Sequence, residues 1–119
     1  MLNKKFRFHS RGGVRYVYQH GKTVRSSKMS LVFCDNARKY TRFAVVVSKK
    51  VEKSAVLRNR IRRRVYEIIR KNLDKIPKER DYIVVIFSRD VLNMKYMEVE
   101  KILGELVEES RVCYNKTNG

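Results

Sequence analysis

The stretch "RNRIRRRVYEIIRK", from Arg58 to Lys71, places seven basic groups beside a single acidic group, Glu67. Cations at helical spacing repel one another, at a cost of roughly a few tenths of a kcal/mol per pair. A polyanionic partner is therefore expected to neutralise this segment, and Glu67 is expected to pair with a basic neighbour in the helix. The candidate neighbours are Arg63, Arg64, Arg70 and Lys71.

The same stretch has the period of an amphipathic helix. Ser54 is a suitable N-cap residue, and Pro77 ends the helical pattern. At about 100° per residue the apolar side chains share one flank. They are Leu57, Ile61, Val65, Ile68 and Ile69. The segment therefore predicts a helix that packs on a sheet and presents its basic side outward.

Shorter apolar segments predict the elements before this helix. Val14, Val17 and Tyr18 have the spacing of a short amphipathic helix that ends at Gly21. Two apolar runs, at 30–34 and 42–48, flank the turn sequence "DNARKYT". They predict an antiparallel hairpin.

After the basic helix, the run "YIVVIF" at 82–87 predicts a central strand, and a last amphipathic helix is expected from Lys95 to about Val112. The element order is α-β-β-α-β-α, which indicates a single α+β domain over 1–119 with a small central sheet. It would begin with a basic lead-in at 1–9 and end in a short tail at 113–119. The second and third strands should be parallel, and base rates alone favour a right-handed crossover between them.

The charge is strongly asymmetric along the chain. The 119 residues hold 29 Lys and Arg against 12 Asp and Glu, a net charge of +17. Residues 1–71 carry 21 basic and three acidic groups, a net charge of +18, whereas residues 72–119 carry eight and nine, a net charge of −1. Arginine presents a planar fork of donors to phosphate, so this half favours nucleic-acid binding over a merely solvated helix face.

No catalytic or metal-binding pattern stands out. The three acids of the basic half are far apart, His9 and His20 lack a nucleophile motif, and Cys34 and Cys113 lack zinc-ligand spacing. We therefore predict no catalytic residue and no protein metal ligand. The start of the chain does not read as a signal peptide, and the longest apolar run is too short to span a bilayer, which favours a cytoplasmic protein without a membrane partner.

Most aromatic residues of the basic half are expected to fill the core. Tyr18 and Tyr66 are the exceptions, because Tyr18 lies on a helix near basic residues and Tyr66 lies on the basic flank of the arginine helix. Unpaired bases stack on such rings.

The block "AVLRNRIRRRVYE" (55–67) strongly resembles the protein component of bacterial ribonuclease P. The resemblance continues through "RFAVVVSKKV" (42–51) and "RDYIVVIF" (80–87). It also covers "KKFRF" (4–8) and "VRYVYQHGK" (14–22), so that it spans about residues 4–110.

The resemblance implies a non-catalytic protein subunit that assembles with a large catalytic RNA. That RNA, with Mg²⁺, removes the 5′ leader of precursor tRNA in the bacterial cytoplasm, and DNA is not an expected partner. It also implies a left-handed crossover around the arginine helix. Carried over to this chain, the RNA contacts are Arg58, Asn59, Arg60, Arg62 and Arg63. Arg64 and Arg70, which belong to the same basic helix, complete the predicted RNA-binding set.

The family also binds the single-stranded leader in a cleft between the first helix and the sheet. Tyr18 is the first candidate for this cleft. The other candidates are Val14, Phe33, Val46, Ser48, Lys49 and Tyr66. Val14 stands where the family has an aromatic residue, Tyr66 where it has a basic one, and the loop "VEKSAV" (51–56) is one residue longer than the family pattern.

Two other functions fit part of the same pattern. A ribosome-associated or general RNA-binding protein would share the charge but would not account for the spacing of the "RNR" block. A free-standing protein nuclease would need acidic residues that this half of the chain lacks.

Overall fold

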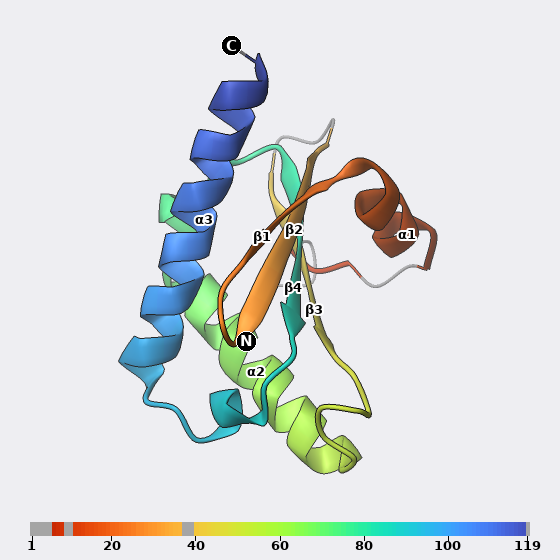
Figure 1. The fold of residues 1–119 in the computed structure, drawn as a ribbon, viewed down its shortest axis with the longest axis vertical. Coiled ribbons are helices and arrows are strands. Elements are labelled where there is room, and N and C mark those ends of the chain that lie inside the picture. The colour runs from red at the N-terminus through yellow and green to blue at the C-terminus, as the bar shows by residue number, and fades with distance from the viewer. Residues whose placement is uncertain (1–5, 9–10, 37–39, 119) are drawn as a thin grey trace.

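The computed structural model describes residues 6–8, 11–36 and 40–118 (Figure 1). Within these residues it contains a four-stranded sheet, three α-helices and short 3-10 turns. The helices are α1 (Arg11–His20), α2 (Ala55–Lys71) and α3 (Tyr96–Asn118), and the strands are β1 (Lys22–Arg25), β2 (Met29–Asp35), β3 (Arg42–Val47) and β4 (Arg80–Ile86). The 3-10 helices are η2 (Leu73–Lys75) and η3 (Arg89–Leu92).

The sheet has the strand order β1-β2-β4-β3. β2 pairs antiparallel with both β1 and β4, whereas β3 pairs with β4 in parallel. α1 covers one face of the sheet, and α2 and α3 cover the other (Figure 1). The single α+β domain and the parallel arrangement predicted for the strands around α2 are therefore confirmed.

The predicted hairpin between β2 and β3 is wrong, because β4 lies between these two strands. β4 is buried along most of its length, and an apolar strand of this kind is stable only when it is covered on both faces and flanked by neighbours. β1 was not predicted at all. It has four residues, of which only Val24 is buried, and an apolar pattern this short does not identify a strand in the sequence.

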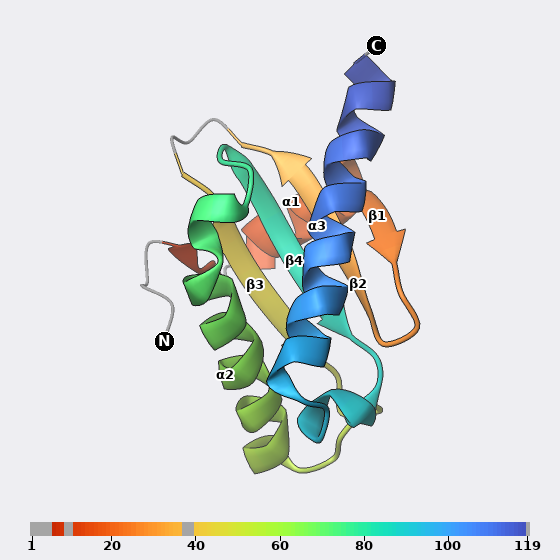
Figure 2. The ribbon, with the colours of Figure 1, turned by 90° about the vertical axis from the view of Figure 1, so that its left-hand side faces the viewer.

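The crossover from β3 through α2 to β4 is left-handed. In Figure 2 β4 runs downward, its parallel neighbour β3 lies to its left, and α2 lies in front of the sheet. When the strands are turned to point upward, β4 falls to the left of β3, which defines the left-handed form. The expectation from base rates is wrong here, and the expectation from the family is confirmed.

Each face of the sheet has its own core. Met29, Leu31 and Phe33 of β2 point toward α2 and α3, whereas Val32 and Cys34 point toward α1. This alternation follows from the two-residue period of a strand. It decides which side chains of β2 face α1.

The N-cap and the buried flank of α2 agree with the predictions made from its sequence. The Ser54 hydroxyl accepts a hydrogen bond from the Leu57 amide at 3.2 Å, which confirms the predicted N-cap. The predicted apolar flank is buried from Ile61 to Ile69. α3, in contrast, continues to Asn118, past its predicted end at Val112 and into the predicted tail.

α1 ends where it was predicted to end, at a glycine. The Gly21 amide donates to the Val17 carbonyl oxygen at 2.7 Å. A Cβ atom at residue 21 would lie 2.5 Å from that oxygen and 2.6 Å from the Phe33 carbonyl oxygen. Only glycine fits this close approach, which sets the distance of α1 from the sheet. Of the predicted lead-in, only residues 6–8 are described, and the Phe8 amide donates to the Phe43 carbonyl oxygen of β3 at 3.0 Å.

Candidate nucleic-acid interface

The basic residues of α2 fall into two groups, and the first is held by the protein itself. Arg64 donates to the carbonyl oxygens of Val91 and Leu92 at 2.9 Å each, and also to that of Met94. Its guanidinium therefore joins α2 to the end of η3. This placement argues against the predicted role of Arg64 as an RNA ligand, because three of its N–H groups already have acceptors within the protein.

Arg58 is also tied to the chain, at the start of α2. It donates to the carbonyl oxygens of Glu52 and Lys53 at 2.9 Å each. The Glu52 carboxylate is buried, accepts the Ser54 amide at 3.0 Å, and lies 3.1 Å from the Arg89 guanidinium. The Ser54 amide and then Arg89 hold the pKa of Glu52 below its ordinary value. These contacts order the loop that leads into the helix.

Arg70 pairs with Glu67 on the exposed side of α2. Its Nε lies 3.1 Å from each carboxylate oxygen, and its Nη2 lies 2.5 Å from one of them. The hydrogen bonds from Arg70 lower the pKa of Glu67. The intrahelical partner predicted for Glu67 is therefore confirmed as Arg70.

The second group consists of Asn59, Arg60, Arg62 and Arg63. Within the described part of the chain, these side chains have no hydrogen-bond acceptor and no ion-pair partner. Arg60 and Arg63 are exposed and border an open hollow of about 600 Å³ beside Leu92. Several unpaired guanidinium groups on one helix create a positive field suited to phosphate groups.

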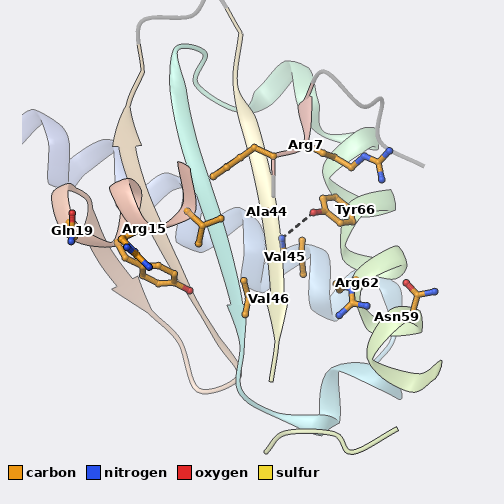
Figure 3. Close-up of a pocket in the computed structure, with 12 residues that line it drawn as sticks. Arg7, Arg15, Gln19, Ala44, Val45, Val46, Asn59, Arg62 and Tyr66 are labelled. Carbon is orange, nitrogen blue, oxygen red and sulfur yellow. Dashed lines mark hydrogen bonds between the residues drawn. The ribbon is translucent and has the colours of Figure 1, made fainter. Parts of the chain in front are cut away.

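A cleft of about 710 Å³ runs between α1, β3 and α2. Figure 3 shows the side chains around it, which come from α1 on one side of β3 and from α2 on the other. The lining residues are Arg7, Phe8, Val14, Arg15, Tyr18, Gln19, Ala44, Val45, Val46, Asn59, Arg62 and Tyr66. Of the residues predicted for the leader cleft, the structure brings Val14, Tyr18, Val46 and Tyr66 together here.

Tyr18 and Tyr66 both line this cleft but differ in how far their side chains are exposed. Tyr18 remains 46% exposed on α1, so a base can reach its ring. Tyr66 is buried, and its hydroxyl accepts the Val45 amide of the edge strand β3 at 3.2 Å (Figure 3). The Arg7 guanidinium lies 5.9 Å from the centre of the Tyr66 ring. Burial raises the pKa of the Tyr66 hydroxyl, as it does for Tyr18.

Three predicted cleft residues lie elsewhere. Phe33 is fully buried in the core on the side of α2 and α3, so its predicted role in the cleft is wrong. Its neighbours Val32 and Cys34 face α1, because successive residues of a strand point to opposite faces. Ser48 and Lys49 are exposed beyond the end of β3 and do not line this cavity.

Sequence reasoning missed Arg7, Phe8, Arg15 and Gln19 as cleft residues. Arg15 and Gln19 have the helical spacing of Val14 and Tyr18, and this period could have found them. Arg7 and Phe8 are brought to the cleft by an isolated bridge between Arg7 and Phe43. No local pattern in the sequence signals such a long-range pairing.

The described residues offer neither a metal site nor a membrane-spanning helix. No group of three or more His, Cys, Asp or Glu side chains among them could hold a metal ion. None of the helices within this part of the chain is long and apolar enough to cross a membrane.

Comparison with known proteins identifies the family of this chain. The family model described as Ribonuclease P matches residues 2–111. The chain belongs to the ribonuclease P protein family. The ribonuclease P protein component of Clostridium botulinum (strain 657) is 39% identical over 102 residues, which cover 85% of this chain and 89% of the relative. That of Syntrophus aciditrophicus is 35% identical over 106 residues, covering 89% and 87%.

Solved structures of this family share the fold. The RNase P protein from Thermotoga maritima superposes with a TM-score of 0.78 at 26% identity, covering 87% of this chain and 96% of that one. The Staphylococcus aureus RNase P protein gives a TM-score of 0.76 at 24% identity, covering 90% and 96%. The family predicted from the "RNR" block is confirmed, and the chain has its role in ribonuclease P as the protein component.

Proposed function

We propose that this chain binds the catalytic RNA of ribonuclease P and the 5′ leader of precursor tRNA, and so assists removal of the leader to give mature tRNA 5′ ends. The observation that carries this proposal is a group of α2 side chains that have no partner among the described residues, directly beside an open cleft with an exposed tyrosine. Arg62 and Asn59 belong to both surfaces. One protein can therefore hold two parts of an RNA complex close together.

The unpartnered arginines are assigned to the catalytic RNA. Each phosphate that a guanidinium neutralises releases condensed counterions, so binding is strong at low salt and weakens steeply as salt rises. The mutual repulsion of Arg60, Arg62 and Arg63 in the free protein is relieved when phosphates lie between them.

The cleft is assigned to the leader. Its floor is apolar, with Phe8, Val14 and Val46, and its rim carries Arg7 and Arg15. An unpaired base gains by stacking on an exposed ring such as Tyr18 while basic residues follow its backbone. Mature tRNA has lost the 5′ leader, so the cleft favours precursor over mature tRNA.

The cleavage step is assigned to the RNA subunit with Mg²⁺, and the protein is assigned no catalytic residue. Hydrated Mg²⁺ is usually held by carboxylates together with phosphates, and the basic side of α2 offers phosphate-binding groups instead. The RNA can therefore hold the ions while the protein neutralises neighbouring phosphates. The bacterial cytoplasm, which contains precursor tRNA, is the expected location.

Reconstitution tests this function. The chain is added to bacterial ribonuclease P RNA at low Mg²⁺, and cleavage of a precursor tRNA with a labelled leader is followed. We expect the protein to raise the cleavage rate. RNA binding without any change in rate would instead indicate a general RNA-binding protein, and cleavage by the protein without RNA would contradict the assignment of chemistry.

A further inference from the structure

The cleft between α1, β3 and α2 extends to both sides of the edge strand β3. Figure 3 shows Arg15 of α1 on one side, and Arg7, Arg62 and Tyr66 on the other side, beside α2. The exposed ring of Tyr18 belongs to α1 and therefore to the first side. The two sides differ in their chemistry, because the side beside α2 combines two guanidinium groups with a buried hydroxyl.

Arg7 is held in place by the segment that precedes α1. This segment forms a parallel bridge with Phe43 of β3, and the amide of the next residue, Phe8, donates to the Phe43 carbonyl oxygen at 3.0 Å. The Arg7 guanidinium lies over the Tyr66 ring, with 5.9 Å between Cζ and the ring centre, which is within the range of a cation–π contact. The backbone bridge and the ring together fix the direction of the Arg7 side chain.

The guanidinium of Arg7 is positioned without an acceptor among the described residues. Of its three nitrogens, only Nε is buried, and none of the described residues accepts a hydrogen bond from it. Nη1 and Nη2 therefore remain accessible from the cleft that Arg7 lines. A side chain that is already ordered loses little conformational freedom when it binds an anion, so its donors are prepared for one.

Tyr66 supplies a second donor beside Arg7. Its hydroxyl oxygen accepts the Val45 amide at 3.2 Å, so its hydrogen is available for another acceptor. Burial raises the pKa of Tyr66, whereas the Val45 amide, Arg7 and Arg62 lower it. Both guanidinium groups are therefore close enough to act on this hydroxyl. The described lining of the cleft contains no acidic side chain, and an anion beside the hydroxyl would be attracted by two positive charges.

From this arrangement we propose that Arg7 and the Tyr66 hydroxyl hold one backbone phosphate of the RNA strand that occupies the cleft. Nη1 and Nη2 of Arg7 form the planar fork that grips a phosphate, and Tyr66 positions this fork and donates its own hydrogen. Arg62, which also belongs to the surface assigned to the catalytic RNA, adds to the positive field. The proposal rests on the proposed function, because it takes the leader as the strand. The leader then crosses β3, with a base on Tyr18 at one side and a phosphate on Arg7 at the other.

Removal of single phosphate charges tests this contact. Precursor tRNAs carry one uncharged methylphosphonate linkage in the leader, placed at a different position in each substrate, and their affinity for holoenzyme reconstituted with the full chain is measured. For wild type, neutralisation of one linkage should weaken binding roughly tenfold, as expected for the loss of a hydrogen bond between charged groups. In Arg7→Ala the same linkage should become insensitive, because the contact is already lost, and the other linkages should keep their wild-type effects.

Salt dependence provides a second readout. Arg7→Ala should reduce the slope of log affinity against log salt by about 0.7, the value for one phosphate of a single strand. Arg7→Lys keeps the charge and should restore the slope, but it lacks the planar fork and should not restore the full affinity. Tyr66→Phe keeps the ring under Arg7 and loses only a neutral donor. It should keep the wild-type slope while binding roughly threefold more weakly.

Two further variants control for general effects. Lys101→Ala removes one positive charge from an exposed position on α3 outside the cleft, and it should match wild type both in slope and in its response to each linkage. Arg15→Ala removes a charge from the α1 side and should keep the sensitivity to the linkage assigned to Arg7. Each variant is compared with itself on ordinary and modified precursors, so a general loss of stability does not imitate the effect.

Two results would overturn the proposal. One is an Arg7→Ala variant that keeps the full wild-type sensitivity to the assigned linkage, and the other is a wild-type profile in which no leader linkage stands out. The proposed function would stand in either case if Tyr18→Ala still reduced the preference for precursor over mature tRNA. Failure of the proposed function would be seen differently, as wild-type protein that neither binds precursor tRNA nor stimulates ribonuclease P RNA.

Discussion

Arg63 and Arg64 are neighbours in sequence with the same charge, yet the structure gives them opposite roles. Arg63 is exposed and has no partner among the described residues, whereas Arg64 donates to three carbonyl oxygens at and just after the end of η3. Replacing each by alanine removes one positive charge from the same turn of α2. The two variants therefore separate a phosphate contact from a structural contact.

The expected magnitudes follow from these contacts. Loss of one phosphate contact reduces the slope of log affinity against log salt by about 0.9 on duplex RNA, if RNA behaves as B-DNA does, and by about 0.7 on a single strand. Arg63→Ala should show this change, with a free energy of unfolding within about 0.5 kcal/mol of wild type. Arg64→Ala should keep the wild-type slope and should lose about 1–3 kcal/mol of stability, because it removes charge-assisted hydrogen bonds that are partly buried.

The assay has two parts. Binding of each variant to ribonuclease P RNA is measured over a salt series, and thermal unfolding is measured without RNA. Arg64→Lys is a useful third variant, since it keeps the charge but cannot reproduce the planar fork of donors. The reasoning is refuted if Arg64→Ala lowers the slope as much as Arg63→Ala while its melting temperature is unchanged.

Three further predictions concern the cleft and the loops that position it. Tyr18→Ala should reduce the affinity for precursor tRNA by roughly tenfold, through the loss of a stacked base, and should leave mature tRNA binding unchanged in the reconstituted holoenzyme. Gly21→Ala should destabilise the fold by about 1–3 kcal/mol in thermal unfolding, because its Cβ would overlap two backbone oxygens. The pKa of the buried Glu52 carboxylate is lowered from its ordinary value of 4.5, so the ionised carboxylate stabilises the fold above pH 4.5. Wild-type stability should therefore fall as the pH is lowered below 4.5, because this contribution is progressively lost. Glu52→Gln should show a weaker pH dependence over the same range.

Each of these has a clear contrary result. Equal losses for precursor and mature tRNA would make Tyr18 a structural residue. A Gly21→Ala variant as stable as wild type would show that α1 can move away from the sheet without cost. Identical acid unfolding curves for wild type and Glu52→Gln would remove Glu52 from the set of groups that stabilise the loop.

The parts of the fold that depend on neighbouring residues could be predicted from the sequence. The N-cap at Ser54, the buried flank of α2 and the glycine at the end of α1 are local features, and all three are confirmed. Strand order depends on contacts between distant segments, so the insertion of β4 between β2 and β3 could not be read from local patterns. The left-handed crossover followed from the family resemblance and contradicted the general rule.

The candidate site shows the same division. The position of the basic helix and the choice of Tyr18 as a candidate for base stacking followed from residue type and spacing, whereas the cleft came from the family resemblance. The partners of Arg64 are carbonyl oxygens 27 to 30 residues away, and a carbonyl acceptor leaves no mark in the sequence. Phe33 was assigned to the cleft from the family resemblance, whereas the two-residue period of β2 places it with Met29 and Leu31 on the face of α2 and α3.

The central claim is that the unpartnered arginines of α2 bind the catalytic RNA, and a structure of the chain bound to ribonuclease P RNA and precursor tRNA tests it most directly. It should place the guanidinium nitrogens of Arg60, Arg62 and Arg63 within about 3 Å of RNA phosphate oxygens, with Arg64 still joined to the end of η3. A complex in which these three side chains face solvent, and α3 contacts the RNA in their place, would contradict the account.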